Sequence, residues 1–175
     1  APDKGRSALD AGEAMDNMVN MMREHIPMET RIHYVITNGG KAPNVVPDYA
    51  EVYYYVRHPK REQVKEIFER VVLAAKGAAM GTETKMEMEI IGGTHDLLPN
   101  KTLAEIMNQN LRKTGGVQYT EEEKSFAQKI QSSFTYKVPA ISYADSIKAF
   151  SGIIVPLAGG GSTDVGDVSY VVPTV

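Results

Sequence analysis

The stretch GGKAPNVVPDYAEVYYYVR, residues 39–57, combines a loop with a strand pattern. The Gly39-Gly40 pair allows backbone conformations that other residues rarely adopt, and the prolines before and after Asn44 stiffen the loop around it. Alternate positions toward Arg57 predict a strand with two distinct faces. One face would carry Ala50, Val52, Tyr54 and Val56, and the other Glu51, Tyr53, Tyr55 and Arg57. The stretch therefore predicts a strand preceded by a loop that presents Asn44.

The segments around this stretch predict two helices and two further strands. Ser7 followed by Asp10 is a helix-capping pair, and apolar side chains then recur every three or four residues, which predicts a helix over 7–25. Its many methionines suit either an adaptable groove or a core, and the helical spacing favours the core. A second helix is predicted at 60–80, and alternation predicts strands at 31–37, 49–57 and 84–91.

The order of these elements is α-β-β-α-β, which is typical of an α+β fold. A ferredoxin-like sandwich has the order β-α-β-β-α-β, so the pattern equals that architecture without its first strand. We therefore predict a ferredoxin-like domain over residues 1–92. The missing strand would occupy a central slot, leaving the strands at 49–57 and 84–91 each with an unpaired edge.

Residues 93–175 have a different character and predict a second, partial α/β segment. Asn100 can cap one helix, and Thr120 with Glu123 forms a capping box for another. Residues 135–157 are predicted to be mostly irregular around a short strand at 152–155. The glycines at 159–161 predict a loop that leads into a buried strand at 168–172.

Composition excludes several classes of protein. The chain has 175 residues with 42% hydrophobic and 23% charged side chains, as in ordinary globular domains. The net charge of −3 argues against a nucleic-acid-binding surface, and no apolar run is long enough to span a membrane. The absence of cysteine excludes disulfides and is compatible with a cytoplasmic location.

The histidines do not predict a metal site within the chain. The four of them, His25, His33, His58 and His95, have no spacing that would place two on one helix face or on alternate positions of one strand. The run Gly159 to Asp164 resembles a phosphate-binding loop only superficially, because no lysine and no amphipathic helix follow it. We therefore expect no metal to bind stoichiometrically to these residues.

The motif Gly-Gly-x-x-x-Asn-Val-Val-Pro-Asp-x-x-Glu, followed by a strand that ends in Arg, resembles the lid or dimerisation domain of the di-metal amidohydrolases. This family includes aminoacylases, carboxypeptidase G and hippurate hydrolases. The segments APDKGRSALDAGEAM and GGGSTDVGDVSYVVPTV are similar to the branch that acts on p-aminobenzoyl-glutamate. The resemblance implies that the chain is a lid domain fused to part of the later half of a catalytic domain.

The resemblance also implies substrate-binding residues. The matching Asn in the family reaches from the lid to polar atoms of the substrate, so Asn44 is a candidate, together with Gly39 and Gly40. Alternatively, Asn44 closes a turn by bonding its own backbone. Arg57 matches an arginine that clamps the substrate carboxylate, although it could be a surface charge at a strand end. Further candidates are two aspartates, Asp164 and Asp167, which could orient metal ligands or simply cap their loop.

The activity implied by the resemblance is metal-assisted hydrolysis of the amide of p-aminobenzoyl-glutamate or of a similar N-acyl amino acid. Two divalent metals, zinc or manganese, are implied for a full-length parent, whose ligands lie outside this chain. We expect the chain alone to be inactive, and to form a homodimer through the strand at 31–37 and the helix at 7–25. The alternative functions are a ferredoxin-like module that only dimerises and one that binds a small molecule.

Overall fold

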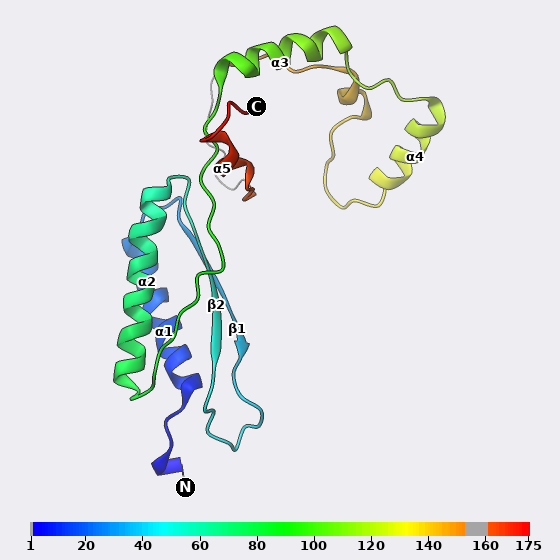
Figure 1. Ribbon diagram of the computed structural model, residues 1–175. Helices are drawn as coiled ribbons and strands as arrows, with labels where there is room; N and C mark the ends of the chain where they lie inside the picture. The colour runs from blue at the N-terminus through cyan, green and yellow to red at the C-terminus, as the bar shows by residue number, and fades with distance from the viewer. Residues whose placement is uncertain (1, 153–160) are drawn as a thin grey trace. The chain divides into compact units, whose positions relative to one another are not determined.

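The computed structural model describes residues 2–152 and 161–175 (Figure 1). These residues divide into two compact units, one built mainly from residues 2–96 and the other from 97–152 with 163–175. The first unit contains the 3-10 helices η1 (Pro2–Lys4) and η2 (Arg23–His25), the helices α1 (Ala8–Met22) and α2 (Arg61–Gly81), and the strands β1 (Arg31–Asn38) and β2 (Glu51–Arg57). The second contains α3 (Lys101–Thr114), α4 (Glu121–Gln131), the 3-10 helix η3 (Ile141–Asp145) and α5 (Val165–Ser169).

The two strands of the first unit form an antiparallel hairpin. Ile32 pairs with Val56 and Tyr34 with Tyr54, and the register is irregular between Ile36 and Asn38. Because side chains alternate along a strand, Ile32, Tyr54 and Val56 lie on the face that packs against the core. The α+β character and the predicted strands at 31–37 and 49–57 are therefore confirmed.

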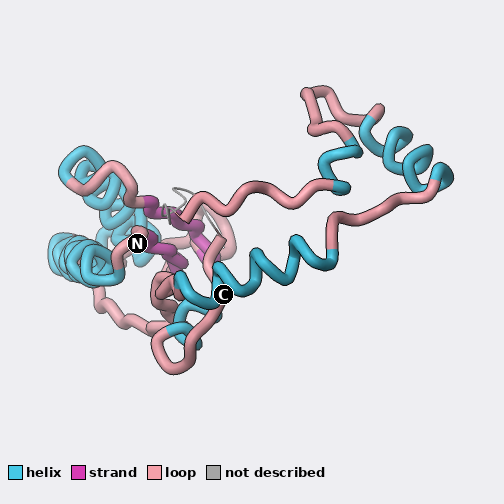
Figure 2. Tube along the Cα trace, turned by 90° about the horizontal axis from the view of Figure 1, so that it is seen from above, coloured by secondary structure: helices cyan, strands magenta, loops and turns pink. Residues whose placement is uncertain are grey.

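Helices α1 and α2 lie side by side on one side of the hairpin, as the view from above shows (Figure 2). The predicted N-cap of α1 is present, since the Ser7 side chain accepts a hydrogen bond from the Asp10 backbone N–H at 3.1 Å. The shared core holds side chains from both helices and from β1. It consists of Val19, Met22, Ile32, Ile67 and Val71, with Met15, Ile26, Tyr54, Val56 and Ala74 packed around it.

The methionine-rich stripe of α1 contributes to this core. Met22 is buried and Met15 packs against the buried cluster, whereas Met18 and Met21 remain exposed. On α2 the alanines at 75, 78 and 79 are buried. The small side chains are compatible with close packing of the two helices, and a Cβ on Gly77 would lie 3.8 Å from the Met18 sulfur.

The predicted strand at 84–91 is not formed. Residues 84–91 follow α2 as a trace without secondary structure, and the hairpin contains no further strand among the described residues. Three of their apolar side chains are more than half exposed: Met88, Ile90 and Ile91. In the predicted ferredoxin-like order, the absent first strand separates 84–91 from β2, so these residues have no backbone with which to pair. The full ferredoxin-like topology stays a prediction.

Local capping signals account for the helices of the second unit. The Asn100 side chain accepts from the Leu103 N–H at 3.0 Å, and both hydrogen bonds of the Thr120–Glu123 capping box are present. Neither α3 nor α4 buries a residue, which leaves Phe126 66% exposed. These helices are therefore specified by their ends rather than by a core.

The C-terminal residues differ from their prediction. The sequence predicts a buried strand at 168–172, but residues 165–169 form the short helix α5, and Val168, Val171 and Val172 are exposed. Among the described residues, no strand lies beside them to pair with. Only its Gly166 and Ser169 are buried, and the Ser169 hydroxyl accepts from the Leu98 N–H at 2.8 Å. The predicted strand at 152–155 and the start of the glycine-rich loop lie outside the described residues, apart from Gly152 and Gly161.

One buried polar pair joins α1 to the sheet. The Tyr54 hydroxyl donates a hydrogen bond to Asp16 Oδ1, and Asp16 is only 5% exposed. The Tyr34 ring stacks on Tyr54 with the centroids 5.2 Å apart. Burial raises the pKa of Asp16, and burial together with the Asp16 hydrogen bond raises the pKa of Tyr54 well above its usual value. The hydroxyl therefore stays protonated as the donor of this bond.

Replacing the donor of this pair should destabilise the first unit. Tyr54→Phe leaves Asp16 buried without the hydroxyl, and losing the partner of a buried polar group costs about 1–3 kcal/mol. Chemical denaturation would measure the free energy of unfolding. Tyr55→Phe is the matched control, because Tyr55 is 57% exposed on the opposite face, and its change should stay within about 0.5 kcal/mol. Equal losses for the two variants would contradict a special role for the buried pair.

Candidate functional site

The loop that connects β1 to β2 forms one wall of a groove of about 680 Å³. The other wall comes from the N-terminal residues and the first turn of α1. The groove is lined by Pro2, Ser7, Leu9, Asp10, Gly39, Gly40, Lys41, Ala42, Pro43, Asn44, Val45, Val46 and Pro47. The structure thus places three predicted substrate-binding residues, Gly39, Gly40 and Asn44, in one concave surface.

Several contacts hold this loop in shape. The Asn38 side chain accepts from the Gly40 N–H at 3.0 Å, and the Ala8 N–H donates to the Pro47 carbonyl at 2.9 Å. Gly40 has a φ of +110°, and a Cβ there would lie 2.9 Å from Pro47 Cγ. Glycine is therefore required at position 40 both by its backbone conformation and by its close approach to proline.

Asn44 is exposed on this loop and its side chain makes no hydrogen bond to any residue that the structure describes. The turn-closing interpretation of this side chain therefore has no support from the structure. An amide has both a donor and an acceptor, so Asn44 can hydrogen-bond both kinds of polar atom in a ligand. Lys41 and Asp10 add one positive and one negative side chain to the same groove.

Arg57 lies at the other end of the hairpin. It ends β2 and pairs with Arg31, whereas the loop joins the opposite ends of the strands. At about 3.3 Å per residue, the seven residues of β2 put Arg57 about 20 Å from Glu51. The loop packs toward α1 and does not fold back along the strand. Within one chain, Asn44 and Arg57 are therefore not brought together.

The two candidate aspartates belong to the second unit. Asp164 precedes α5 without capping it through its side chain, and Asp167 lies in its first turn. Both therefore sit at the start of a short helix. The capping interpretation is thus not supported for Asp164, and a role in orienting metal ligands stays a prediction for both.

The described residues do not fit a metal centre. Residues 2–152 and 161–175 contain no group of three or more His, Asp or Glu side chains that could hold a metal ion. His58 is engaged locally, since its Nδ1 accepts from the Lys60 N–H at 2.9 Å. We therefore derive no chemical step through a metal bound to this chain.

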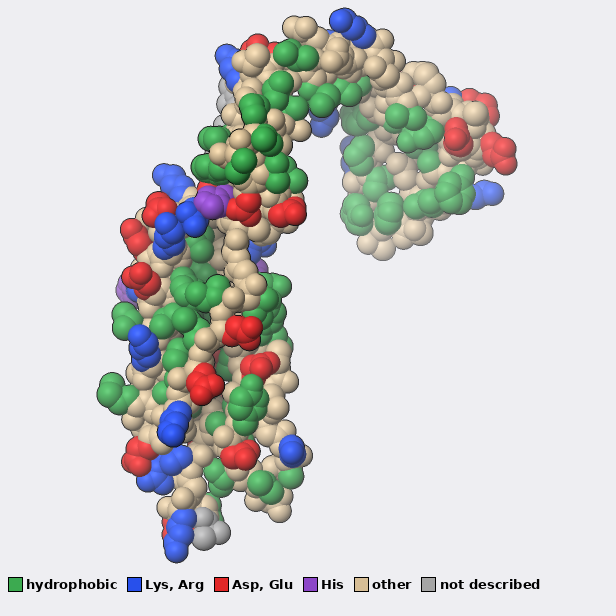
Figure 3. Space-filling model, in the orientation of Figure 1, with side chains coloured by type: hydrophobic (Ala, Val, Ile, Leu, Met, Phe, Trp, Pro, Cys, Tyr) green, Lys and Arg blue, Asp and Glu red, His purple; other side chains and the backbone are tan. Residues whose placement is uncertain are grey.

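The surface charges of the first unit are mixed. Lys and Arg side chains alternate with Asp and Glu over the face drawn in Figure 3. This face thus differs from the clustered positive surface of nucleic-acid-binding domains. In addition, none of the described helices is both long and apolar enough to cross a membrane.

The sequence analysis missed two features of this region. It did not predict that Ser7, Leu9 and Asp10 of the first helical turn face the loop. It also placed Glu51 only on the outward face of its strand, whereas the Glu51 carboxylate accepts hydrogen bonds from Thr37 and Tyr49. The occurrence of this glutamate within the Gly-Gly-x-x-x-Asn motif was the available signal.

Comparison with known proteins identifies the first unit. Residues 1–83 match the family model of a peptidase dimerisation domain. The chain is 38% identical to one of the p-aminobenzoyl-glutamate hydrolase subunits of Escherichia coli, over 99% of this chain and 40% of that protein. It is 28% identical to the human Xaa-Arg dipeptidase, over 99% of this chain and 33% of the relative. A Haemophilus influenzae homologue of the hydrolase's second type of subunit is 28% identical over 62% of this chain and 26% of its own length.

The chain therefore spans well under half the length of these relatives, which are named as hydrolases or peptidases. The match to the dimerisation domain covers the helices and the hairpin of the first unit. The similarity to the Escherichia coli hydrolase extends beyond this unit over nearly the whole chain. The chain thus belongs to the family of peptidases that carry this dimerisation domain, as a relative of p-aminobenzoyl-glutamate hydrolase.

Proposed function

We propose that this chain is the lid and dimerisation part of a metal-dependent amidohydrolase that cleaves the amide of p-aminobenzoyl-glutamate or of a similar N-acyl amino acid. The observation that carries this proposal is the groove in which the loop presents Asn44. The name of the 38% identical relative supports the choice of substrate. Two divalent metals, zinc or manganese, would be bound by other parts of a protein with the relatives' length.

In this proposal the chain binds and orients the substrate. The Asn44 amide hydrogen-bonds polar atoms next to the scissile amide, using its donor and its acceptor. Arg57 pairs with a substrate carboxylate, for which the planar guanidinium offers two parallel donors. Because the two residues lie at opposite ends of the hairpin, they act separately within one chain.

We also propose that the chain forms a homodimer through the free edge of β1 and the adjacent α1. Within the hairpin β1 pairs only with β2, and Val35 on β1 is 53% exposed. An unpaired strand edge offers a row of backbone donors and acceptors to a second chain. The dimerisation-domain match supports association through this unit. A twofold axis would join two copies of the hairpin into one continuous sheet.

Substitution of the proposed binding residues should reduce turnover more than it reduces stability. The test uses a protein of the relatives' length that contains this chain, with Asn44→Ala and Arg57→Ala. Losing a hydrogen bond to a charged group costs about 1.5–3 kcal/mol, which corresponds to roughly a tenfold to hundredfold lower kcat/KM. Steady-state kinetics on aminobenzoyl-glutamate and thermal melting are measured together.

Glu24→Gln serves as the control for these kinetics, since Glu24 lies on the exposed side of η2. Unchanged kinetics for Arg57→Ala would remove that residue from the site. A fall in melting temperature that accounts for the whole loss of activity would make either residue structural.

A charge placed on the free strand should weaken the proposed dimer. Lysine on an edge strand opposes pairing with another chain, so Val35→Lys should shift the mass toward the monomer. Static light scattering over a concentration series reports the mass. Leu73→Lys is the control, because Leu73 is 63% exposed on α2, away from β1, and should leave the dimer intact. A strictly monomeric chain at high micromolar concentration would refute association by this route.

A further inference from the structure

The loop between the strands is closed at its base by the side chain of Glu51, the first residue of β2. Glu51 Oε1 accepts a hydrogen bond from the Thr37 hydroxyl, and Glu51 Oε2 accepts one from the Tyr49 hydroxyl at 2.9 Å. Thr37 is the last residue but one of β1, and Tyr49 belongs to the last residues of the loop itself. One carboxylate therefore links the chain on both sides of the loop.

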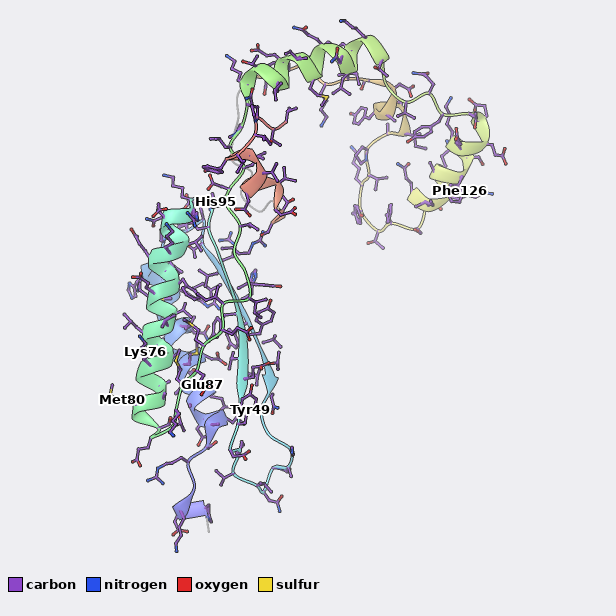
Figure 4. The ribbon with its side chains drawn as sticks, viewed as in Figure 1. Tyr49, Lys76, Met80, Glu87, His95 and Phe126 are labelled. Carbon is purple, nitrogen blue, oxygen red and sulfur yellow. The ribbon has the colours of Figure 1, made fainter. Side chains whose placement is uncertain are left out.

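The position of this link is visible in Figure 4, where the labelled Tyr49 lies at the loop end of the hairpin. The Thr37 hydroxyl also lies 3.3 Å from the Glu51 carbonyl oxygen. The ladder is irregular next to this point, between Ile36 and Asn38. The side-chain contacts thus bridge the two strands where the regular backbone pairing ends.

The charge of Glu51 strengthens these contacts. The hydrogen bonds from Thr37 and Tyr49 lower the pKa of the Glu51 carboxyl group, so that it is ionised at neutral pH. The bond to Glu51 in turn raises the pKa of the Tyr49 hydroxyl, which keeps its proton. Hydrogen bonds to an ionised acceptor are stronger than those between neutral groups.

A second contact holds the loop from the other side, since the Ala8 N–H of α1 donates to the Pro47 carbonyl. Asn44 lies between this contact and the base of the loop. Both restraints are therefore needed to define where the Asn44 amide points. A displacement of about 1 Å in a positioning group can lower catalysis by as much as a hundredfold.

We propose that Glu51 is a positioning residue, which acts through Thr37 and Tyr49 to hold the loop 39–47 so that Asn44 meets the substrate. This inference rests on the proposed function of Asn44. The simpler interpretation is a surface carboxylate with no effect on the loop. Against it stands the convergence of donors from both sides of the loop on one side chain.

The first measurement needs no substrate. Amide hydrogen exchange is followed in the 175-residue chain, for the original sequence and for Glu51→Gln and Tyr49→Phe. Both substitutions keep the size of the side chain, while the first removes the charge and the second one donor. We expect exchange in residues 39–47 to become several-fold faster, with exchange in α2 unchanged. Unchanged exchange in the loop would overturn the proposal.

The second measurement is a double-mutant cycle in a protein of the relatives' length. Glu51→Gln should lower kcat/KM for aminobenzoyl-glutamate about tenfold, mainly through KM, and should have no further effect when Asn44→Ala is already present. Losses that multiply in the double variant would show that Glu51 acts without Asn44, and would overturn the proposal. Tyr55→Phe, on an exposed part of β2, is the control and should retain full activity.

The two measurements separate this inference from the proposed function. If Asn44→Ala itself leaves kcat/KM unchanged, the proposed role of Asn44 is wrong. In that case faster exchange in 39–47 of the Glu51→Gln variant would still support the link at the base of the loop. Rescue is a further criterion, since Glu51→Asp, which keeps the charge, should restore part of the loop protection that Glu51→Gln loses.

Discussion

The packing of α1 and α2 on one face of the hairpin is the constraint on which the first unit depends. Two strands alone bury too little surface to be stable, so a helical layer is needed to cover them. The core between Val19, Ile32 and Val71 supplies this cover, and the Asp16–Tyr54 hydrogen bond lies beside it. A buried polar pair favours one arrangement of α1 on the sheet, because another arrangement would leave both groups unsatisfied.

This arrangement decides where a ligand can bind. Because α1 begins next to the loop, its Ala8 N–H reaches Pro47 and its first turn completes the groove around Asn44. The same packing covers one face of the hairpin and leaves the edge of β1 for association. The proposed substrate contacts and the proposed dimer therefore use different parts of one small scaffold.

Features with local causes could be predicted from the sequence, and features with distant partners could not. Alternation and capping signals identified both strands of the hairpin and the starts of α1, α3 and α4. The strand predictions at 84–91 and 168–172 were wrong, because a strand also needs a neighbour and the described residues offer none. The groove was half predicted: the motif indicated Asn44, while the contribution of Asp10 and Glu51 depended on packing.

The central claim is that the loop 39–47 contacts a bound N-acyl amino acid. The most direct measurement is amide hydrogen exchange in a protein of the relatives' length that contains this chain, with and without a non-hydrolysable analogue of aminobenzoyl-glutamate. The account predicts slower exchange in residues 39–47 when the analogue is bound. Binding of the analogue without any change in exchange at 39–47 would contradict it.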